Sequence, residues 1–318
     1  MNMLRILFIG KSGSFSILPL MAVAKKYNVV GIVESAAKDI NEKNVIRNKI
    51  YRLFHRIKQF RDLKWFAKKF NAQYFLLTKN NVSEMETFIV KQKPDICCVA
   101  SMSQLLRKST LTIPPYGCIN VHPSLLPKYR GPTPLFWTYY FMDIEGGVTV
   151  HYLDEGEDTG DIIKQESFPI QLGEDPSRVM HKASQLGAEL LVHSLDEIVA
   201  GTAKPKIQRH LPCPHRARRI KPEENLIDWQ AWSIERVYHV LKGGRSWHKA
   251  LKPPALLFCF EWGVKEIDRQ LNSKPPGSIQ LDRQGFYAAH PEGKIRLRLA
   301  FSPSRVISSI KKIIKYVA

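Results

Sequence analysis

The stretch that decides the fold is residues 117–131, which read GCINVHPSLLPKYRG. It opens as an extended apolar run in which Asn120 and His122 stand two residues apart, so their side chains point to the same side of a strand. Pro123 and Pro127 then stiffen the loop that follows. A strand that ends in polar side chains before a rigid loop is typical of the carboxyl edge of a parallel sheet, where substrates bind.

Short apolar runs around this stretch predict further strands. They lie at residues 4–9, 29–33, 96–100 and 148–150, and a helical pattern over 15–26 separates the first two. This alternation predicts an α/β domain built on an open, mostly parallel, Rossmann-like sheet. The turn GKSGS at 10–14 fits either an ordinary strand-to-helix connection or an anion cradle at a helix N-terminus.

The pattern changes near residue 202. Residues 202–222 are basic, contain four prolines and show no periodicity, which indicates a linker. Beyond it, short β-like runs separated by Pro-Gly turns predict a small β-rich, barrel-like C-terminal domain. We therefore expect an α/β domain over 1–201, a basic linker over 202–222 and a β-rich domain over 223–318. The last domain contains a helix at 232–241 and ends in a basic amphipathic helix near 306–317.

Composition describes a soluble globular protein, with 44% hydrophobic and 24% charged residues among 318. It excludes disordered, collagen-like and disulfide-stapled chains. The five cysteines show no zinc spacing, so we expect neither a metal site nor structural disulfides. No apolar run reaches the length of a signal segment or a membrane span, which predicts a cytoplasmic protein.

The net charge of +19 is concentrated in three stretches. Residues 43–69 hold ten Lys or Arg and one acid, while 204–221 and 294–318 each hold seven and no acid. Such clusters suit the phosphates of a nucleic acid or an anionic membrane surface. The first stretch equally fits an amphipathic helix with a solvated basic face, because its apolar residues recur at helical spacing.

A second polar cluster follows the run at 148–150. Residues 151–161 read HYLDEGEDTGD, a dense group of acids with glycines that allow sharp turns. Taken singly, a histidine at a strand end or an aspartate in such a turn is an ordinary structural residue. An amide, an imidazole and a carboxylate brought together can polarise a carbonyl, stabilise its oxyanion and remove a proton.

Residues 117–165 resemble the folate-dependent formyltransferases, the family of the glycinamide ribonucleotide and methionyl-tRNA formyltransferases. The matching strings are NVHPSLLPKYRG and GVTVHYLD…DTGD, and weaker similarity extends from about residue 4 to 195. The resemblance implies direct transfer of the formyl group of 10-formyltetrahydrofolate to a primary amine, without a metal. It assigns the catalytic roles to Asn120, His122 and Asp158. The amide and the protonated imidazole then stabilise the oxyanion, and the carboxylate keeps the imidazole charged and helps to move the proton.

The same resemblance places the folate in two loops. The first follows the run at 96–100, and the second is the turn after residue 153. The residues that it assigns to cofactor binding are Ser103, Gln104, Leu105 and Leu106 in the first loop, and Asp154, Glu155 and Gly156 in the second. Residues 219–229 and 276–279 are similar to the small C-terminal domain of methionyl-tRNA formyltransferases and of some sugar formyltransferases.

The acceptor is less clear from the sequence. The strings GPTPLFW at 131–137 and GKSGS at 10–14, together with His151, depart from the tRNA enzymes, which tend to have GAAP, a Gly-Thr-Pro start and a methionine there. These departures favour a small amine such as a nucleotide-linked amino sugar. The basic stretches favour tRNA, whose acceptor-stem phosphates would demand them. A catalytically silent module that binds RNA or a membrane is a third hypothesis, and the oligomeric state stays open.

Overall fold

The computed structural model describes residues 3–35, 62–102, 104–208, 211–221, 227–243, 251 and 260–301. The chain forms two compact units. The first comprises residues 1–135, 145–169 and 177–218, and the second comprises 136–144, 170–176 and 219–318. Residues 202–218, for which the sequence predicts a linker, thus group with the first unit, and two short stretches from within the first 201 residues group with the second.

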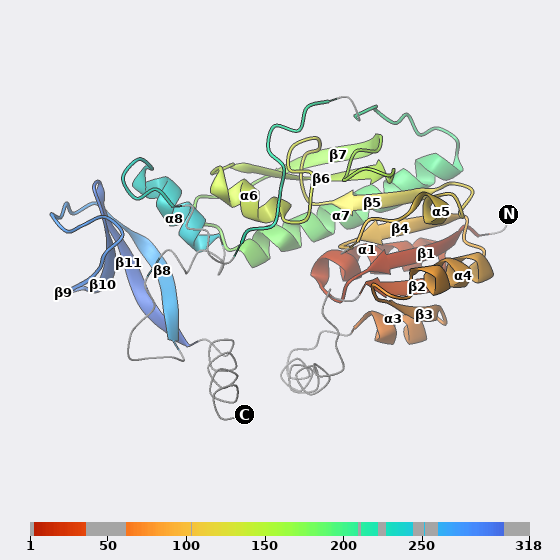
Figure 1. Ribbon diagram of the computed structural model, residues 1–318, viewed down its shortest axis with the longest axis horizontal. Helices are drawn as coiled ribbons and strands as arrows, with labels where there is room; N and C mark the ends of the chain where they lie inside the picture. Colours follow the sequence, from red (N-terminus) through yellow and green to blue (C-terminus); the bar gives the residue numbers. More distant parts are fainter. Residues whose placement is uncertain are drawn as a thin grey trace. The chain divides into compact units, whose positions relative to one another are not determined.

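A seven-stranded sheet forms the centre of the first unit (Figure 1). Its strands are β1 (Arg5–Gly10), β2 (Asn28–Ser35), β3 (Gln73–Leu77), β4 (Ile96–Ala100), β5 (Cys118–His122), β6 (Glu145–Tyr152) and β7 (Ile162–Pro169). The order across the sheet is β3-β2-β1-β4-β5-β6-β7, and the first five strands run parallel. β6 and β7 are antiparallel to their neighbours. The mostly parallel α/β sheet predicted from the sequence is confirmed.

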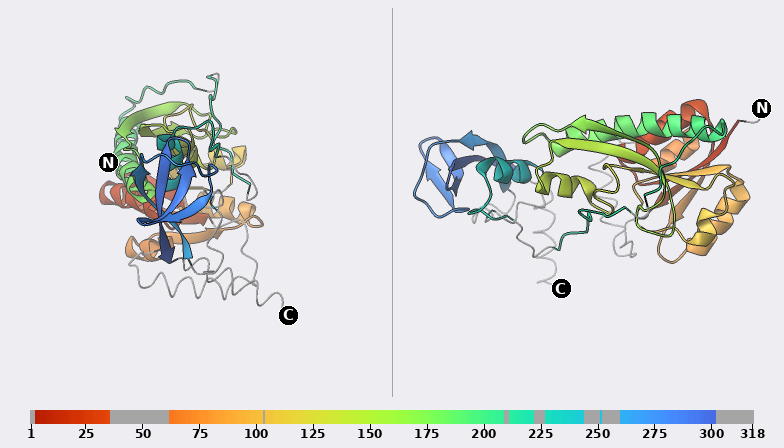
Figure 2. Two further views of the ribbon diagram at one scale, coloured as in Figure 1. Left: turned by 90° about the vertical axis from the view of Figure 1, so that its left-hand side faces the viewer. Right: turned by 90° about the horizontal axis from the view of Figure 1, so that it is seen from above.

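Helices cover both faces of this sheet, which explains why its inner strands are continuous apolar runs. Ile6 and Phe8 of β1 belong to one buried cluster, together with side chains of α1 (Ser14–Lys26), α3 (Leu63–Lys69) and α7 (Pro176–Val199). Leu7 and Ile9 belong to a second cluster with α4 (Val82–Gln92) and α5 (Lys108–Leu111). Figure 2 shows α1 and α7 on one side of the sheet and α4 on the other.

The topology creates a binding edge at the centre of the sheet. β1 has β2 on one side and β4 on the other, so the connections diverge at this point and leave a crevice at the carboxyl ends of the strands. β5 ends at this edge with His122. Because β6 runs antiparallel, its last residue, Tyr152, pairs with Ile119 near the start of β5. The loop after β6 must therefore return along β5 to reach the edge.

The second unit contains a four-stranded antiparallel sheet with the order β8-β11-β10-β9. The strands are β8 (Phe260–Asp268), β9 (Ile279–Asp282), β10 (Gly285–His290) and β11 (Gly293–Phe301). Apolar residues of α8 (Ile234–Lys242) share a buried cluster with this sheet, and Tyr140 of α6 (Pro134–Tyr140) packs beside them. The β-rich C-terminal domain predicted from the sequence is confirmed, and so is its first helix.

Some predictions fall outside the described residues. These are most of the basic stretch at 43–69, the β-like run at 255–260 except its last residue, and the amphipathic helix near 306–317. In the ranges that the structure covers, none of the helices combines the length and the apolar character needed to cross a membrane.

Candidate functional site

The site is built on β5, whose side chains alternate between two environments. Ile119 and Val121 enter the buried cluster under α1 and α7. Asn120 and His122 point to the other face, where they are only 8% and 5% exposed. The β alternation therefore brings an amide and an imidazole to the carboxyl edge of the sheet, as the sequence predicts.

His151 of β6 lies directly opposite Asn120 in the strand register. Its Nδ1 is 2.7 Å from the carbonyl oxygen of Tyr152, so Nδ1 carries the proton and donates it. Complete burial, with a smaller contribution from His122, lowers the pKa of His151 to about 4. The ring is thus neutral near pH 7, and its Nε2 accepts a hydrogen bond from Asn120 Nδ2 at 3.1 Å. This contact orients the Asn120 amide.

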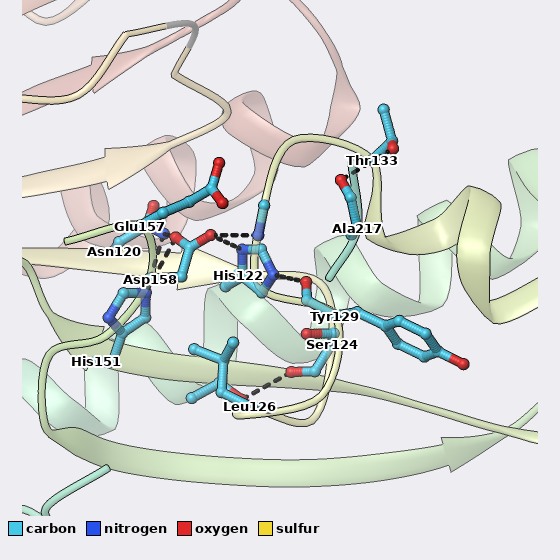
Figure 3. Close-up of polar contacts among 12 residues, drawn as sticks. Asn120, His122, Ser124, Leu126, Tyr129, Thr133, His151, Glu157, Asp158 and Ala217 are labelled. Atoms are coloured by element: carbon cyan, nitrogen blue, oxygen red, sulfur yellow. Dashed lines mark hydrogen bonds and ion pairs between the residues drawn. The ribbon is translucent and has the colours of Figure 1, made fainter. Parts of the chain in front are cut away.

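Asp158 comes from the loop between β6 and β7 and faces these three side chains (Figure 3). Its Oδ2 accepts a hydrogen bond from the Gly131 amide at 2.9 Å and lies 3.6 Å from His122 Nδ1. Its Oδ1 lies 3.5 Å from Asn120 Nδ2 and 3.7 Å from His151 Nε2. The structure therefore brings together the three residues that the resemblance assigns to catalysis.

The two nitrogens of His122 have different surroundings. Nε2 donates to the carbonyl oxygen of Tyr129 at 3.0 Å, a contact visible in Figure 3. Nδ1 faces Asp158 at a distance longer than an ordinary hydrogen bond. A proton on Nδ1 is therefore the one that can be shared with an incoming oxygen atom, with the carboxylate beside it.

The loop that carries Asp158 is closed by its own contacts. Asp154 Oδ1 accepts from the Gly156 amide at 3.0 Å and from the Thr159 hydroxyl at 2.6 Å. At its base, the Tyr152 amide donates to the Asp161 carbonyl at 2.9 Å. Gly160 is required here, because a Cβ at this position would lie 2.0 Å from the Tyr152 carbonyl oxygen.

The residues expected to hold folate lie in two loops that an exposed ion pair connects. Lys108, at the start of α5 beyond the first loop, is 3.2 Å from Glu155 of the second. In the first loop Leu106 is buried, Leu105 is 65% exposed, and Gln104 donates to the Thr78 carbonyl at 3.4 Å. Ser103 lies outside the described residues. Their contact with folate stays a prediction.

Within the described ranges, no group of three or more His, Cys, Asp or Glu side chains is placed to hold a metal ion. Asn120, His122 and Asp158 are separated by 3.5 Å or more, which exceeds ordinary hydrogen-bond distances. An oxygen atom bound between them would gain two donors. This donor set fits the carbonyl of a formyl group.

Three partners of the site are missing from the sequence-based residue list. They are the Gly131 amide, His151 as a partner of Asn120, and Gln208, which contacts the loop of Asp158. The sequence draws attention to His151 only as a mark of the acceptor. Its pairing with Asn120 depends on the antiparallel register of β6, and Gln208 lies in a stretch without periodicity. No local pattern could have identified either contact.

Comparisons with known proteins agree with this site. The family model described as formyl transferase matches residues 5–195, which is more than half of the chain. A methionyl-tRNA formyltransferase of Methylacidiphilum infernorum is 35% identical over 310 residues, covering 93% of this chain and 90% of the relative. The resemblance noted in the sequence is thereby confirmed.

Solved structures of lower identity share the fold. The N-formyltransferase from Helicobacter canadensis, solved with folinic acid and dTDP-3-aminofucose, is 15% identical with a TM-score of 0.61, covering 94% of this chain and 99% of its own. Glycinamide ribonucleotide transformylase 1 from Symbiobacterium toebii is 17% identical with a TM-score of 0.50, covering 65% of this chain and 94% of its own. Together with the family match, these findings establish that the chain belongs to the formyl transferase family, enzymes that transfer the formyl group of formyl-tetrahydrofolate.

Proposed function

We propose that this formyltransferase acts on a small primary amine, such as the amino group of a nucleotide-linked amino sugar, with Asn120, His122 and Asp158 as its catalytic residues. The observation that carries the chemical part is the convergence of these three side chains at the carboxyl edge of the sheet. The amide and the imidazole supply donors, and the carboxylate supplies the acceptor for a proton.

In the proposed reaction the amine nitrogen attacks the formyl carbon, and a new carbon–nitrogen bond forms. Negative charge that develops on the formyl oxygen is stabilised by Asn120 Nδ2 and by a proton on His122 Nδ1. The bond between the formyl carbon and N10 of tetrahydrofolate breaks. The proton lost by the amine passes through a water held by Asp158 to N10, so that formylated amine and tetrahydrofolate leave.

Two departures from the tRNA enzymes support a small acceptor, and both are held firmly in the structure. His151 is fully buried and paired with Asn120, so it is part of the catalytic centre. In the departing string after Gly131, the Thr133 hydroxyl is 2.7 Å from the Arg218 carbonyl oxygen and 3.1 Å from that of Ala217. This second departure therefore belongs to the ordered wall beside the site.

Methionyl-tRNA is the second candidate acceptor, and a different observation favours it. The relative that matches nearly the full length of this chain is named a methionyl-tRNA formyltransferase. The basic stretch at 204–221 supports this alternative, because phosphates of an acceptor stem would be attracted to it.

An acceptor screen tests the proposal. The purified protein is incubated with 10-formyltetrahydrofolate and either dTDP-3-aminofucose or methionyl-tRNA, and formylated product is measured at low and high salt. We expect turnover of the sugar nucleotide with a shallow dependence on salt. A tRNA acceptor should instead lose affinity steeply as salt rises, because several phosphate contacts release counterions.

The outcomes separate the candidates. Turnover of methionyl-tRNA alone refutes the small-acceptor proposal and establishes the second candidate. Turnover of neither acceptor, by a protein whose fold is intact by circular dichroism, refutes both acceptor assignments. Aminofucose without the nucleotide serves as the matched control, since a site built for a nucleotide-linked sugar should use it poorly.

A further inference from the structure

Gln208 is completely buried, although it lies in the basic stretch for which the sequence predicts a linker. Its side-chain nitrogen Nε2 donates two hydrogen bonds to the loop between β6 and β7. One goes to the carbonyl oxygen of Asp158 at 3.1 Å, and the other goes to that of Gly160 at 2.6 Å. A buried amide thus holds the backbone of a proposed catalytic residue.

The other end of this amide holds the loop after β5. Arg130 Nη2 donates to Gln208 Oε1 at 3.0 Å and to the Gln208 backbone carbonyl at 2.8 Å. These contacts determine the orientation of the amide, because a flipped side chain would direct its oxygen at two carbonyls and its nitrogen at a guanidinium. Arg130 immediately precedes Gly131, whose amide binds the Asp158 carboxylate. One side chain therefore links the two loops that meet at the site.

Asp158 needs such support because of its backbone conformation. Its φ of 54° lies in the left-handed region, which is unfavourable for a residue with a Cβ unless surrounding contacts compensate. Gln208 binds the carbonyl of this same residue, so it acts where the backbone is least able to hold itself. Neighbouring main-chain contacts reinforce the arrangement, since the Ala217 amide donates to the Arg130 carbonyl at 2.7 Å.

We propose that Gln208 is a positioning residue: its amide clamps the Asp158 loop to the Arg130 loop and so places the carboxylate against His122. The inference rests on the role proposed above for Asp158. It implies that the stretch following the α/β core is part of the catalytic apparatus, in addition to connecting two units of the chain. Gln208 itself does not touch the reacting atoms.

The test uses the full-length protein with Gln208→Glu. This variant keeps the size of the side chain and an oxygen for Arg130, but it removes the two N–H donors to the loop. We expect kcat to fall about 100-fold, the loss that follows from a displacement of about 1 Å in a catalytic group. KM for 10-formyltetrahydrofolate should change little, because the lost interaction concerns the transition state. Amide hydrogen exchange over residues 155–161 should accelerate.

Gln230→Glu, the same chemical change at an exposed glutamine, is the matched control and should leave kcat and exchange as in wild type. Gln208→Met is a second variant that removes donor and acceptor together, and it should lose at least as much activity. Turnover is measured with dTDP-3-aminofucose and with methionyl-tRNA, while hydrogen exchange needs neither acceptor. Failure of wild type to use either acceptor therefore refutes the acceptor assignments and leaves the exchange measurement as the test of the clamp.

Three results would overturn the inference. Wild-type kcat in Gln208→Glu is the first. A loss of activity without faster exchange in the 155–161 loop is the second, because the loop would then be held without Gln208. The third is faster exchange spread equally over β1 and α7, which would show a general structural role.

Discussion

Asp158 combines a strained backbone with a carboxylate that faces three polar side chains. Its two oxygens have separate surroundings, one with the Gly131 amide and His122, the other with Asn120 and His151. Because the Gly131 contact is charge-assisted and short, it fixes the carboxylate, and the longer distances to His122 and Asn120 leave room for substrate. Positioning and catalysis are thus divided among different contacts of one residue.

Replacing Asp158 by Asn, or His122 by Ala, should abolish formyl transfer while the protein remains folded. The Asn side chain can still accept from the Gly131 amide but can neither take a proton nor stabilise a charged imidazole. The loss of a positioned acid or base lowers rates by about 100- to 10,000-fold. Product formation with the acceptor found in the screen measures this, and circular dichroism checks the fold.

Asp161→Asn is the control, because this nearby carboxylate has no contact with Asn120, His122 or His151 in the described structure. It should retain nearly the wild-type rate. Near wild-type rates in either Asp158→Asn or His122→Ala would defeat the catalytic assignment.

At the scale of elements, the pairing of β5 with α7 supports the site from below. Val121, between Asn120 and His122, points into the opposite cluster and meets Gly187 of α7. A Cβ built on Gly187 would lie 2.7 Å from Val121 Cγ1, closer than carbon atoms approach in proteins. Glycine in the middle of a helix therefore has a packing reason here, since it lets α7 lie close to the strand that carries the proposed catalytic residues.

Gly187→Ala should therefore destabilise the protein. In an exposed helix this substitution stabilises by about 1 kcal/mol, because alanine has the higher helix propensity. Here the added methyl has to displace Val121, and overpacking of this kind costs about 1–3 kcal/mol. The free energy of unfolding in urea measures the difference.

Glu189→Ala, on the exposed side of the same helix, tests propensity without packing and should be nearly neutral. If Gly187→Ala proved more stable than wild type, the close approach of α7 to β5 would be wrong. A decrease in kcat that accompanies the loss of stability would show that the position of β5 matters to the site.

At the scale of the whole molecule, each compact unit contains one buried neutral histidine. His151 belongs to the first unit. His239 of α8 belongs to the second, where its Nδ1 accepts from the Gly173 amide at 2.9 Å and its ring stacks on Tyr139 at 4.6 Å. Burial lowers the pKa of His239 to about 4, as it does for His151. Protonation of either ring would replace an acceptor by a donor and break these contacts.

Stability should therefore fall as the solution is acidified. Both histidines have a pKa of about 4 in the folded protein and one of about 6.5 in the unfolded chain. Between these values the unfolded state binds more protons, so the free energy of unfolding rises with pH and is lost towards pH 4. Each histidine contributes about 1.4 kcal/mol per pH unit within this window. Urea denaturation between pH 7.5 and 4.5 measures the slope.

The variants His151→Gln and His239→Gln should each make this dependence shallower. His181→Gln, at an exposed position of α7, should leave it unchanged. An unchanged slope in both buried variants would contradict neutral histidines at these sites.

Net charge also belongs to this scale, and it contributes little to the chemistry. The proposed catalytic residues lie between 120 and 158, outside the three basic stretches. Of the basic stretch at 204–221, Arg216 is paired with Glu157 at 2.5 Å beside the site. The charge therefore bears on which acceptor approaches the enzyme, and the screen at two salt concentrations addresses it directly.

The sequence by itself determined the strands, their burial on both faces and the residues that meet at the carboxyl edge. Continuous apolar runs and a two-residue alternation are local signals, so Asn120 and His122 could be placed on one side of a strand from their spacing alone. Asp158 was found through a family resemblance, because its contact with β5 spans a loop that no periodicity describes.

Only the tertiary structure decided how these residues are held. The antiparallel register of β6 sets His151 against Asn120, and the return of the 202–218 stretch buries Gln208 beside Asp158. Both contacts join residues far apart in the chain, and their partners are backbone carbonyls that any residue type supplies. Side-chain identity therefore carried no signal for them, since hydrogen bonds to the main chain depend on where the chain passes and not on which residue it presents.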